Sequence, residues 1–456
     1  MSWLQRYRAR LYFRNSMWVI PAVGSVLGWF VVAFVARLER RLGWEMQISL
    51  DTARIAIGTM AASMFSLVVV ICSATLVAVQ LASAQLTPRI ISFIYRSRSR
   101  KVVIGIFAFT FTFSLSYLLR IEGTVPLVTS YVAAAFFLIN LVLFLYFIDG
   151  IGKALRPSAA LHAVALTGRD SIRDVYPQAL TDTHPRAAEP LIGEPTRSLV
   201  NLSDGVVLAF DLKGLVSLAE RANCVIELVP EVGDFVAAGD PLFRIFGNGR
   251  RLSDQELRNS VALGQERTME QDPMFAFRIM VDIASKALSP AVNDPTTAVL
   301  AIDQIHHLLR DVGGRYLAEG RERDANGNLR LAYPTPNWED FVSLAVTEIR
   351  QYGATSVQVT RRLRALLENL IVTLPERRIE PLKYELALLQ SAIEHAFVEP
   401  GDRVRASVSD LQGIGGGTEQ LDRHEPLRSE ADLRTGANRL DGTADARLDR
   451  ATSRSA

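Results

Sequence analysis

Polar side chains recur at regular spacing inside the most apolar stretch of the chain, between Ile55 and Arg89. They follow one another in steps of four, three or seven residues: Thr59, Ser63, Ser66, Ser73 and Gln80. This spacing keeps them on a single stripe of a helix. Lipid cannot satisfy a polar stripe on a membrane helix, so the stripe must face protein or water. Two interpretations stay open: packing within or between protomers, and the lining of a water-filled path.

A second group of polar residues surrounds a predicted helix start in the soluble part of the chain. Its members are Asn293, Asp294, Thr296 and Thr297, with Pro295 among them. Asp294 suits the N-cap and Pro295 the first helical position. The free N–H groups of such a start can bind an anion, although the Asp294 carboxylate would oppose one. The alternatives are a ligand or partner site and a rigid corner satisfied by its own caps.

Patterns typical of catalysis are missing. His306 and His307 are adjacent, so on a helix they point about 100° apart and do not chelate one metal together. The chain has no HEXXH spacing, serine nucleophile elbow, phosphate loop or dinucleotide fingerprint. We therefore expect no enzyme, no catalytic residue, no metal site and no cofactor. Arg278 and Asp282 lie four residues apart and are predicted to pair on one helix face.

Composition is uneven along the 456 residues. The first third is very apolar, the middle resembles a soluble protein, and the last part is polar. A net charge of +2 gives no indication of nucleic-acid binding. Cys72 and Cys224 lie in different settings and make neither a disulfide framework nor a metal cluster.

Four transmembrane helices are predicted in a membrane domain over residues 1–149. They cover about 18–36, 55–83, 102–119 and 125–148. Arginines without acidic neighbours precede the first span, and a basic loop joins the second and third spans. The positive-inside rule therefore places both termini in the cytoplasm, although arginines in the first outer loop oppose this. Hydroxyl residues and Asn140 in the last two spans are expected to support helix packing by hydrogen bonds.

The remaining chain is predicted to form a cytoplasmic α+β region and a disordered tail. Its parts are a connector (150–195), a small β-rich module (196–250), a helical domain (251–398) and the tail (399–456). The helical domain is predicted to begin with a helix over Asp254–Thr268. A β-hairpin is expected around Asn326-Gly327.

Two long stretches resemble a known family. They are MAASMFSLVVVICSATLVAVQLASAQLTPRII (Met60–Ile91) and ALSPAVNDPTTA (Ala287–Ala298). They are similar to the most recognisable parts of the domain of unknown function 2254 family of bacterial membrane proteins, and the resemblance covers roughly Met1 to Val398. It implies an inner-membrane protein with an N-terminal membrane region and a C-terminal soluble region. It implies no activity, and no catalytic residue is carried over.

The leading functional hypothesis is a homo-oligomeric, channel-like or transport-associated inner-membrane protein with a cytoplasmic regulatory domain. The alternative is a membrane-anchored sensor or scaffold that binds a ligand or partner through the corner at Asn293–Thr297. A membrane-surface enzyme is a third hypothesis, but it lacks any nucleophile–base or metal constellation. The expected partners are the lipid bilayer and further copies of the chain, without nucleic acid. The sequence does not identify a small-molecule or ion ligand.

Overall fold

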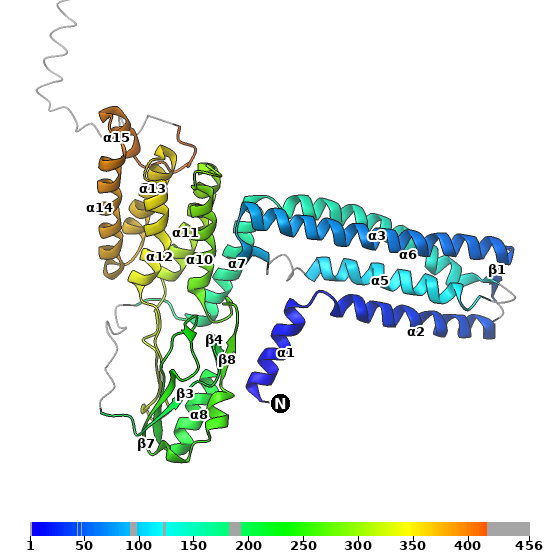
Figure 1. The fold of residues 1–456 in the computed structure, drawn as a ribbon, viewed down its shortest axis with the longest axis horizontal. Helices are drawn as coiled ribbons and strands as arrows, with labels where there is room; N and C mark the ends of the chain where they lie inside the picture. Colours follow the sequence, from blue (N-terminus) through cyan, green and yellow to red (C-terminus); the bar gives the residue numbers. More distant parts are fainter. Residues whose placement is uncertain are drawn as a thin grey trace, which may run out of the picture.

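The computed structural model describes residues 2–42, 44–46, 48–91, 98–121, 125–181 and 193–416. Within these residues, four helices are long and apolar enough to cross a membrane. They are α2 (Val19–Leu42), α3 (Leu50–Gln85), α5 (Arg98–Leu118) and α6 (Leu127–Ala154). Each predicted span falls on one of them. Figure 1 shows the four lying side by side as a bundle that projects from the rest of the molecule.

Close helix contact holds the bundle together. A Cβ atom added at Gly28 of α2 would lie 2.6 Å from the Phe109 carbonyl oxygen of α5, so the two backbones nearly touch. Between α5 and α6, the buried Asn140 Nδ2 donates to Thr110 Oγ1 at 2.6 Å. This bond confirms the prediction that polar residues of these spans hydrogen-bond across the helix interface.

A short β pair closes the end of the bundle that lies far from the soluble region. Strand β1 (Glu45–Met46) pairs antiparallel with β2 (Val125–Pro126). Beside it, the buried Glu39 carboxylate accepts hydrogen bonds from the Val128 and Thr129 N–H groups. A carboxylate at this position caps α6 and matches the positive end of its dipole.

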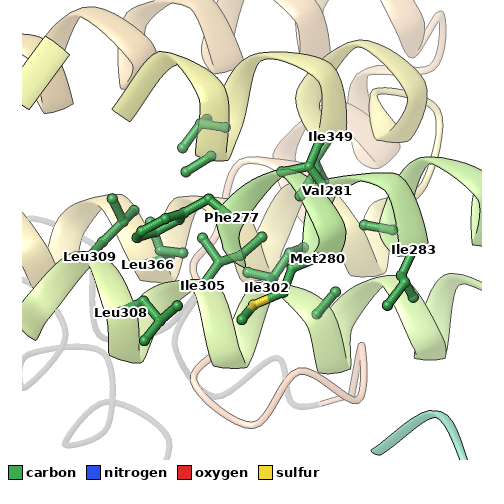
Figure 2. Close-up of a cluster of buried hydrophobic side chains, with 14 of the residues drawn as sticks. Phe277, Met280, Val281, Ile283, Ile302, Ile305, Leu308, Leu309, Ile349 and Leu366 are labelled. Atoms are coloured by element: carbon green, nitrogen blue, oxygen red, sulfur yellow. The ribbon is translucent and has the colours of Figure 1, made fainter. Parts of the chain in front are cut away.

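At the other end of the bundle, helices from distant parts of the sequence share one large hydrophobic core. They are α7 (Pro157–Val175), α10 (Pro273–Ala287), α11 (Pro295–Gly313), α12 (Trp338–Gly353), α13 (Val357–Thr373) and α14 (Ile379–Ala396). Figure 2 shows Phe277 and Met280 of α10 packed against Ile305 and Leu308 of α11. Helix α7 lies in the predicted connector, yet it packs against α10 and α11 as part of this core.

A β module packs beside these helices. Its strands are β3 (Arg197–Val200), β4 (Gly205–Phe210), β5 (Cys224–Leu228), β6 (Phe235–Val236), β7 (Pro241–Gly247), β8 (Val261–Gly264), β9 (Arg321–Arg323) and β10 (Leu329–Ala332). They form a five-stranded sheet, β3-β7-β5-β10-β9, and a three-stranded sheet, β6-β4-β8. Only the β10–β5 pair is parallel. Short helices complete the described chain: α1 (Trp3–Asn15), α8 (Leu212–Ala222), α9 (Asp254–Arg258), α15 (Pro400–Ala406), and the 3-10 turns Pro88–Ile90, Gly249–Arg251 and Glu376–Arg378.

The β module takes up more of the sequence than predicted. The helix expected over Asp254–Thr268 stops at Arg258, because Val261–Gly264 pairs with β4 as strand β8. The predicted hairpin at Asn326-Gly327 is confirmed, with Gly327 in the left-handed region at φ 82°. Its second strand, β10, also joins β5 of the five-stranded sheet.

Ordered packing continues beyond residue 399, where the tail was predicted to start. Helix α15 is followed by a loop in which Asp410 accepts from the N–H groups of Gln412 and Gly413. Arg361 of α13 donates to the carbonyls of Val408 and Gly415. Polar and backbone contacts therefore hold this segment without aromatic residues, and the predicted tail starts too early. Residues 417–456 lie outside the described part of the chain.

Candidate functional site

The predicted polar stripe lies on the open face of α3. Thr59, Ser66, Ser73 and Gln80 are exposed, and Ser63 is half-buried. The buried residues of α3, such as Met64 and Ile71, pack toward α5 and α6. At about 100° per residue, the mean directions of the two sets differ by roughly 160°. The chain therefore covers one side of α3 and leaves the polar side without a partner helix among the described residues.

Three of the stripe hydroxyls bond to their own helix. Thr59 Oγ1 donates to the Ile55 carbonyl, Ser63 Oγ to the Thr59 carbonyl, and Ser66 Oγ to the Ala62 carbonyl, at 2.8 to 3.1 Å. Such bonds to the residue four positions earlier satisfy the hydroxyl proton and leave the oxygen able to accept. The stripe can thus meet water or a neighbouring helix without rearrangement.

The register between α3 and α5 divides the stripe. The helices are antiparallel, because Arg54 Nη2 donates to the Ile121 carbonyl at 3.2 Å and the rings of Phe65 and Phe111 lie 5.8 Å apart. Continuing this register places Gln80 beyond Arg98, the first residue of α5. The hydroxyl residues therefore lie alongside α5 within the bundle. Gln80 lies at the end of the bundle that adjoins the helical domain.

The last turns of α3 and the residues that follow it enter the core of the helical domain. Val79, Ala82, Leu86 and Ile90 are at most 8% exposed and belong to the same buried cluster as α7, α10 and α11. A helix of 36 residues is about 54 Å long, whereas a bilayer core is about 30 Å thick. Helix α3 is thus long enough to join the bundle to the helical domain without a break.

Polar contacts fix this junction. Lys286 Nζ of α10 donates to the Ser83 carbonyl at 3.0 Å, and Arg89 forms an ion pair with Asp282. Asp282 also accepts from Arg278 Nε at 2.6 Å, which confirms the predicted pair. Arg278 in turn donates to Glu348 of α12, and that hydrogen bond holds the pKa of Glu348 below its ordinary value. Burial, with Arg278 and Arg267 nearby, lowers the pKa of Arg89.

The predicted corner is satisfied by its own caps. Asn293 has a left-handed backbone at φ 49°, and the Asp294 N–H donates to the Ala287 carbonyl at 2.7 Å. The Asp294 carboxylate accepts from the Thr297 N–H at 3.0 Å and from the Thr297 hydroxyl at 2.5 Å. Thr297 is buried and Thr296 is exposed. The geometry is that of a rigid turn between α10 and α11, and the carboxylate occupies the place an anion would take.

Comparison with known proteins places the chain in a family. The model described as "Predicted membrane protein (DUF2254)" matches residues 14–369. The chain belongs to this family. It is also 27% identical over 424 residues to proteins described as uncharacterized, Mb1321c of Mycobacterium bovis and Rv1290c of Mycobacterium tuberculosis. Each match covers 88% of this chain and 81% of the relative. No solved structure matches the chain significantly.

In this DUF2254 chain, the end of the stretch Met60–Ile91 contacts α10 just before the stretch Ala287–Ala298 begins. Ser83 and Arg89 belong to the first, and the second begins at Ala287, next to Lys286. Both segments lie at the ends of apolar helices, which is the local signal that could have suggested this contact. His306 Nε2 lies 2.9 Å from Asn369 Oδ1, and burial lowers the pKa of His306.

An acidic cluster between the β module and the helical domain was not predicted. Burial raises the pKa of Glu231 to about 7, with further contributions from Asp234, Asp340 and Asp272. Arg267 pairs with Asp272, the N-cap of α10, and partly offsets this negative charge. The turn Glu231–Asp234 appeared in the sequence only as a strand boundary, and its partners come from distant segments. In the described part of the chain, no three His, Cys, Asp or Glu side chains are arranged to hold a metal ion.

Proposed function

We propose that this protein is a subunit of an oligomeric, channel-like assembly in the bacterial inner membrane, with a regulatory region in the cytoplasm. In this assembly α2, α3, α5 and α6 cross the bilayer. The hydroxyl stripe of α3 faces the common axis of several protomers. The helical domain, joined to α3 without a break, controls the position of that helix.

The distribution of charge supports a cytoplasmic location for both termini. The first helix carries arginines and no acidic residue, and Arg98, Arg100 and Lys101 begin α5 at the same end of the bundle. Helix α1 packs against β8, so the N-terminus and the soluble region share one side (Figure 1). Positively charged segments favour the cytoplasmic side.

The polar stripe opposite the packed face of α3 is the observation that carries the proposal. Lipid would leave the acceptor oxygens of Ser63, Ser66 and Ser73 without partners, whereas water or a second α3 would satisfy them. Closed rotational symmetry brings the same face of each protomer to one axis. A hydroxyl-lined axis suits ions or small polar solutes, because it supplies acceptors and donors without fixed charge.

Cysteine accessibility tests the pore. In a Cys72→Ala background, which keeps only the buried Cys224, one cysteine is introduced at Ser63, Ser66 or Ser73. A membrane-impermeant charged thiol reagent is applied to the protein in lipid vesicles. Val142→Cys on α6 is the control, because Val142 is 67% exposed and its neighbours Leu138, Ile139 and Leu145 are exposed apolar residues. We expect the stripe cysteines to react at least about tenfold faster than the control, because the reagent attacks the thiolate and the thiol ionises only in contact with water.

Oxidative cross-linking distinguishes an oligomer that packs along α3 from one that encloses a water-filled pore. If Ser66→Cys forms disulfides between protomers but does not react with the aqueous reagent, the stripe is a packing surface and the pore is refuted. If neither reaction occurs, the oligomeric axis along α3 is refuted as well. Reaction at the Val142→Cys control would show that the reagent does not discriminate lipid from water.

A cleft in the soluble region favours a second candidate function, a membrane-anchored sensor. It has a volume of about 1170 Å³ and lies between β5, β9 and the start of α12. Glu319 lines it, and its buried Oε1 has no hydrogen-bond partner among the described residues. A cationic or hydrogen-bond-donating metabolite would match this oxygen. A set of cytoplasmic amines should then raise the melting temperature of the full chain but not of Glu319→Ala. An equal response of both proteins would exclude this site.

A further inference from the structure

Helix α1 lies crosswise between the bundle and the β module (Figure 1). Ser2 and Gln5 form a capping box at its start. Tyr7 is buried in a cluster with Leu208 and Ala262 of strands β4 and β8. At its other end, Lys101 Nζ at the start of α5 donates to the Arg14 carbonyl at 2.6 Å. Helix α1 is therefore fixed at the level where the apolar bundle begins.

An apolar pocket opens between the second half of α1 and the strands. Its volume is about 510 Å³. Tyr7, Leu11, Tyr12 and Trp18 line one side, and Leu208 and Leu263 line the other. Trp18 is 61% exposed and immediately precedes α2, the first helix of the bundle. Aromatic side chains at this level are typical of the membrane–water interface.

Arg8 supplies positive charge beside this apolar pocket. It is exposed, lines the pocket, and forms no hydrogen bond or ion pair with another described residue. Arg6 and Arg10 are also exposed, and α1 has no acidic residue in its sequence. At about 100° per residue, Arg10 points roughly 160° away from Arg8. Only Arg8 of these three therefore combines positive charge with the apolar pocket.

We propose that this pocket binds one anionic phospholipid of the cytoplasmic leaflet. One acyl chain of the lipid occupies the space between Leu11, Trp18 and Leu263, and Arg8 binds the headgroup phosphate by charge-assisted hydrogen bonds. Charge complementarity and the apolar lining together match an amphiphile with a negative head. The proposal rests on the membrane location of α2 given above, but not on whether the stripe of α3 faces water.

Native mass spectrometry of the full-length protein in detergent tests this site. The probe is dioleoyl phosphatidylglycerol, and dioleoyl phosphatidylcholine is the neutral comparison. We expect one retained phosphatidylglycerol per chain and weaker retention of phosphatidylcholine. Arg8→Gln should reduce the affinity for phosphatidylglycerol about tenfold, the effect of one lost charge-assisted contact. Arg10→Gln, a matched change on the opposite side of α1, should leave it within about twofold.

Two further arms make the result decisive. Leu11→Trp, which fills the pocket, should also reduce lipid retention, whereas soluble glycerol phosphate should fail to compete with the lipid. Equal losses of phosphatidylglycerol affinity in Arg8→Gln and Arg10→Gln would show only general attraction by a basic helix and would overturn the site. Competition by glycerol phosphate would overturn the lipid assignment in favour of a free phosphate. Neither outcome changes the expected cysteine accessibility along α3. The lipid site and the pore are therefore tested independently.

Discussion

Replacing Leu86 by alanine should destabilise the soluble helical domain, although Leu86 immediately follows a helix of the apolar bundle. Leu86 is 2% exposed and lies in the cluster shared by α7, α10 and α11. Leucine-to-alanine changes at such sites cost about 2–5 kcal/mol, through lost apolar contact and the cavity that remains. At about 1.4 kcal/mol per factor of ten, local opening should become roughly 30- to several-thousand-fold more frequent.

Hydrogen–deuterium exchange of the full-length protein measures this effect. Peptides from α10 and α11 should exchange faster in Leu86→Ala, while those from α5 and α6 remain unchanged. Leu81→Ala is the matched control, because Leu81 lies five positions earlier in the chain but is 43% exposed. Its effect on α10 and α11 should stay within about 0.5 kcal/mol. Equal exchange in the two variants would refute the inference that the end of α3 is part of the soluble core.

Three other predictions concern the bundle and the acidic cluster. Gly28→Val should destabilise the bundle by about 1–3 kcal/mol through overpacking against α5, whereas Gly150→Val, with open space around its Cβ, should cost less in a detergent melting assay. Glu39→Ala should cost on the order of 3 kcal/mol, because it leaves the first N–H groups of α6 unpaired, and Glu39→Gln should recover part of this in the same assay. Because the pKa of Glu231 is raised in the folded state, its contribution to stability is fully present at pH values below the ordinary pKa of glutamate. This contribution is lost as the pH rises through about 7. Glu231→Gln should therefore match the parent melting temperature at about pH 4 and exceed it at about pH 8; a constant difference would contradict the assignment.

The sequence predicted the elements that long local patterns define. Apolar runs without charge identified all four bundle helices, and Asn326-Gly327 identified its hairpin, because a left-handed glycine is a local requirement. Strand β8 was misread as helix, since Val261–Gly264 is too short to show alternation and acquires its conformation by pairing with β4. The predicted N-cap at Asp294 is also confirmed, because its side chain accepts a hydrogen bond from Thr297, only three residues away.

What depended on distant contacts was not predictable from one sequence. The ion pair of Arg89 with Asp282 joins residues that are far apart in the chain, and no periodicity links them. The same holds for α7, whose amphipathic pattern suits a surface stalk as well as a core helix. The polar stripe was visible from spacing alone, but its position opposite the packed face of α3 required the neighbouring helices.

The uninterrupted course of α3 limits how this protein can be divided. A fragment beginning at Pro157 would keep α7 and all later helices, yet it would lose Leu86 and Ile90 from its own interior. It would also lose α1, whose Tyr7 covers Ala262 of the β module. The region that follows α6 therefore depends structurally on the segments that precede it. Cutting the chain between α6 and α7 should therefore expose apolar surface on both fragments.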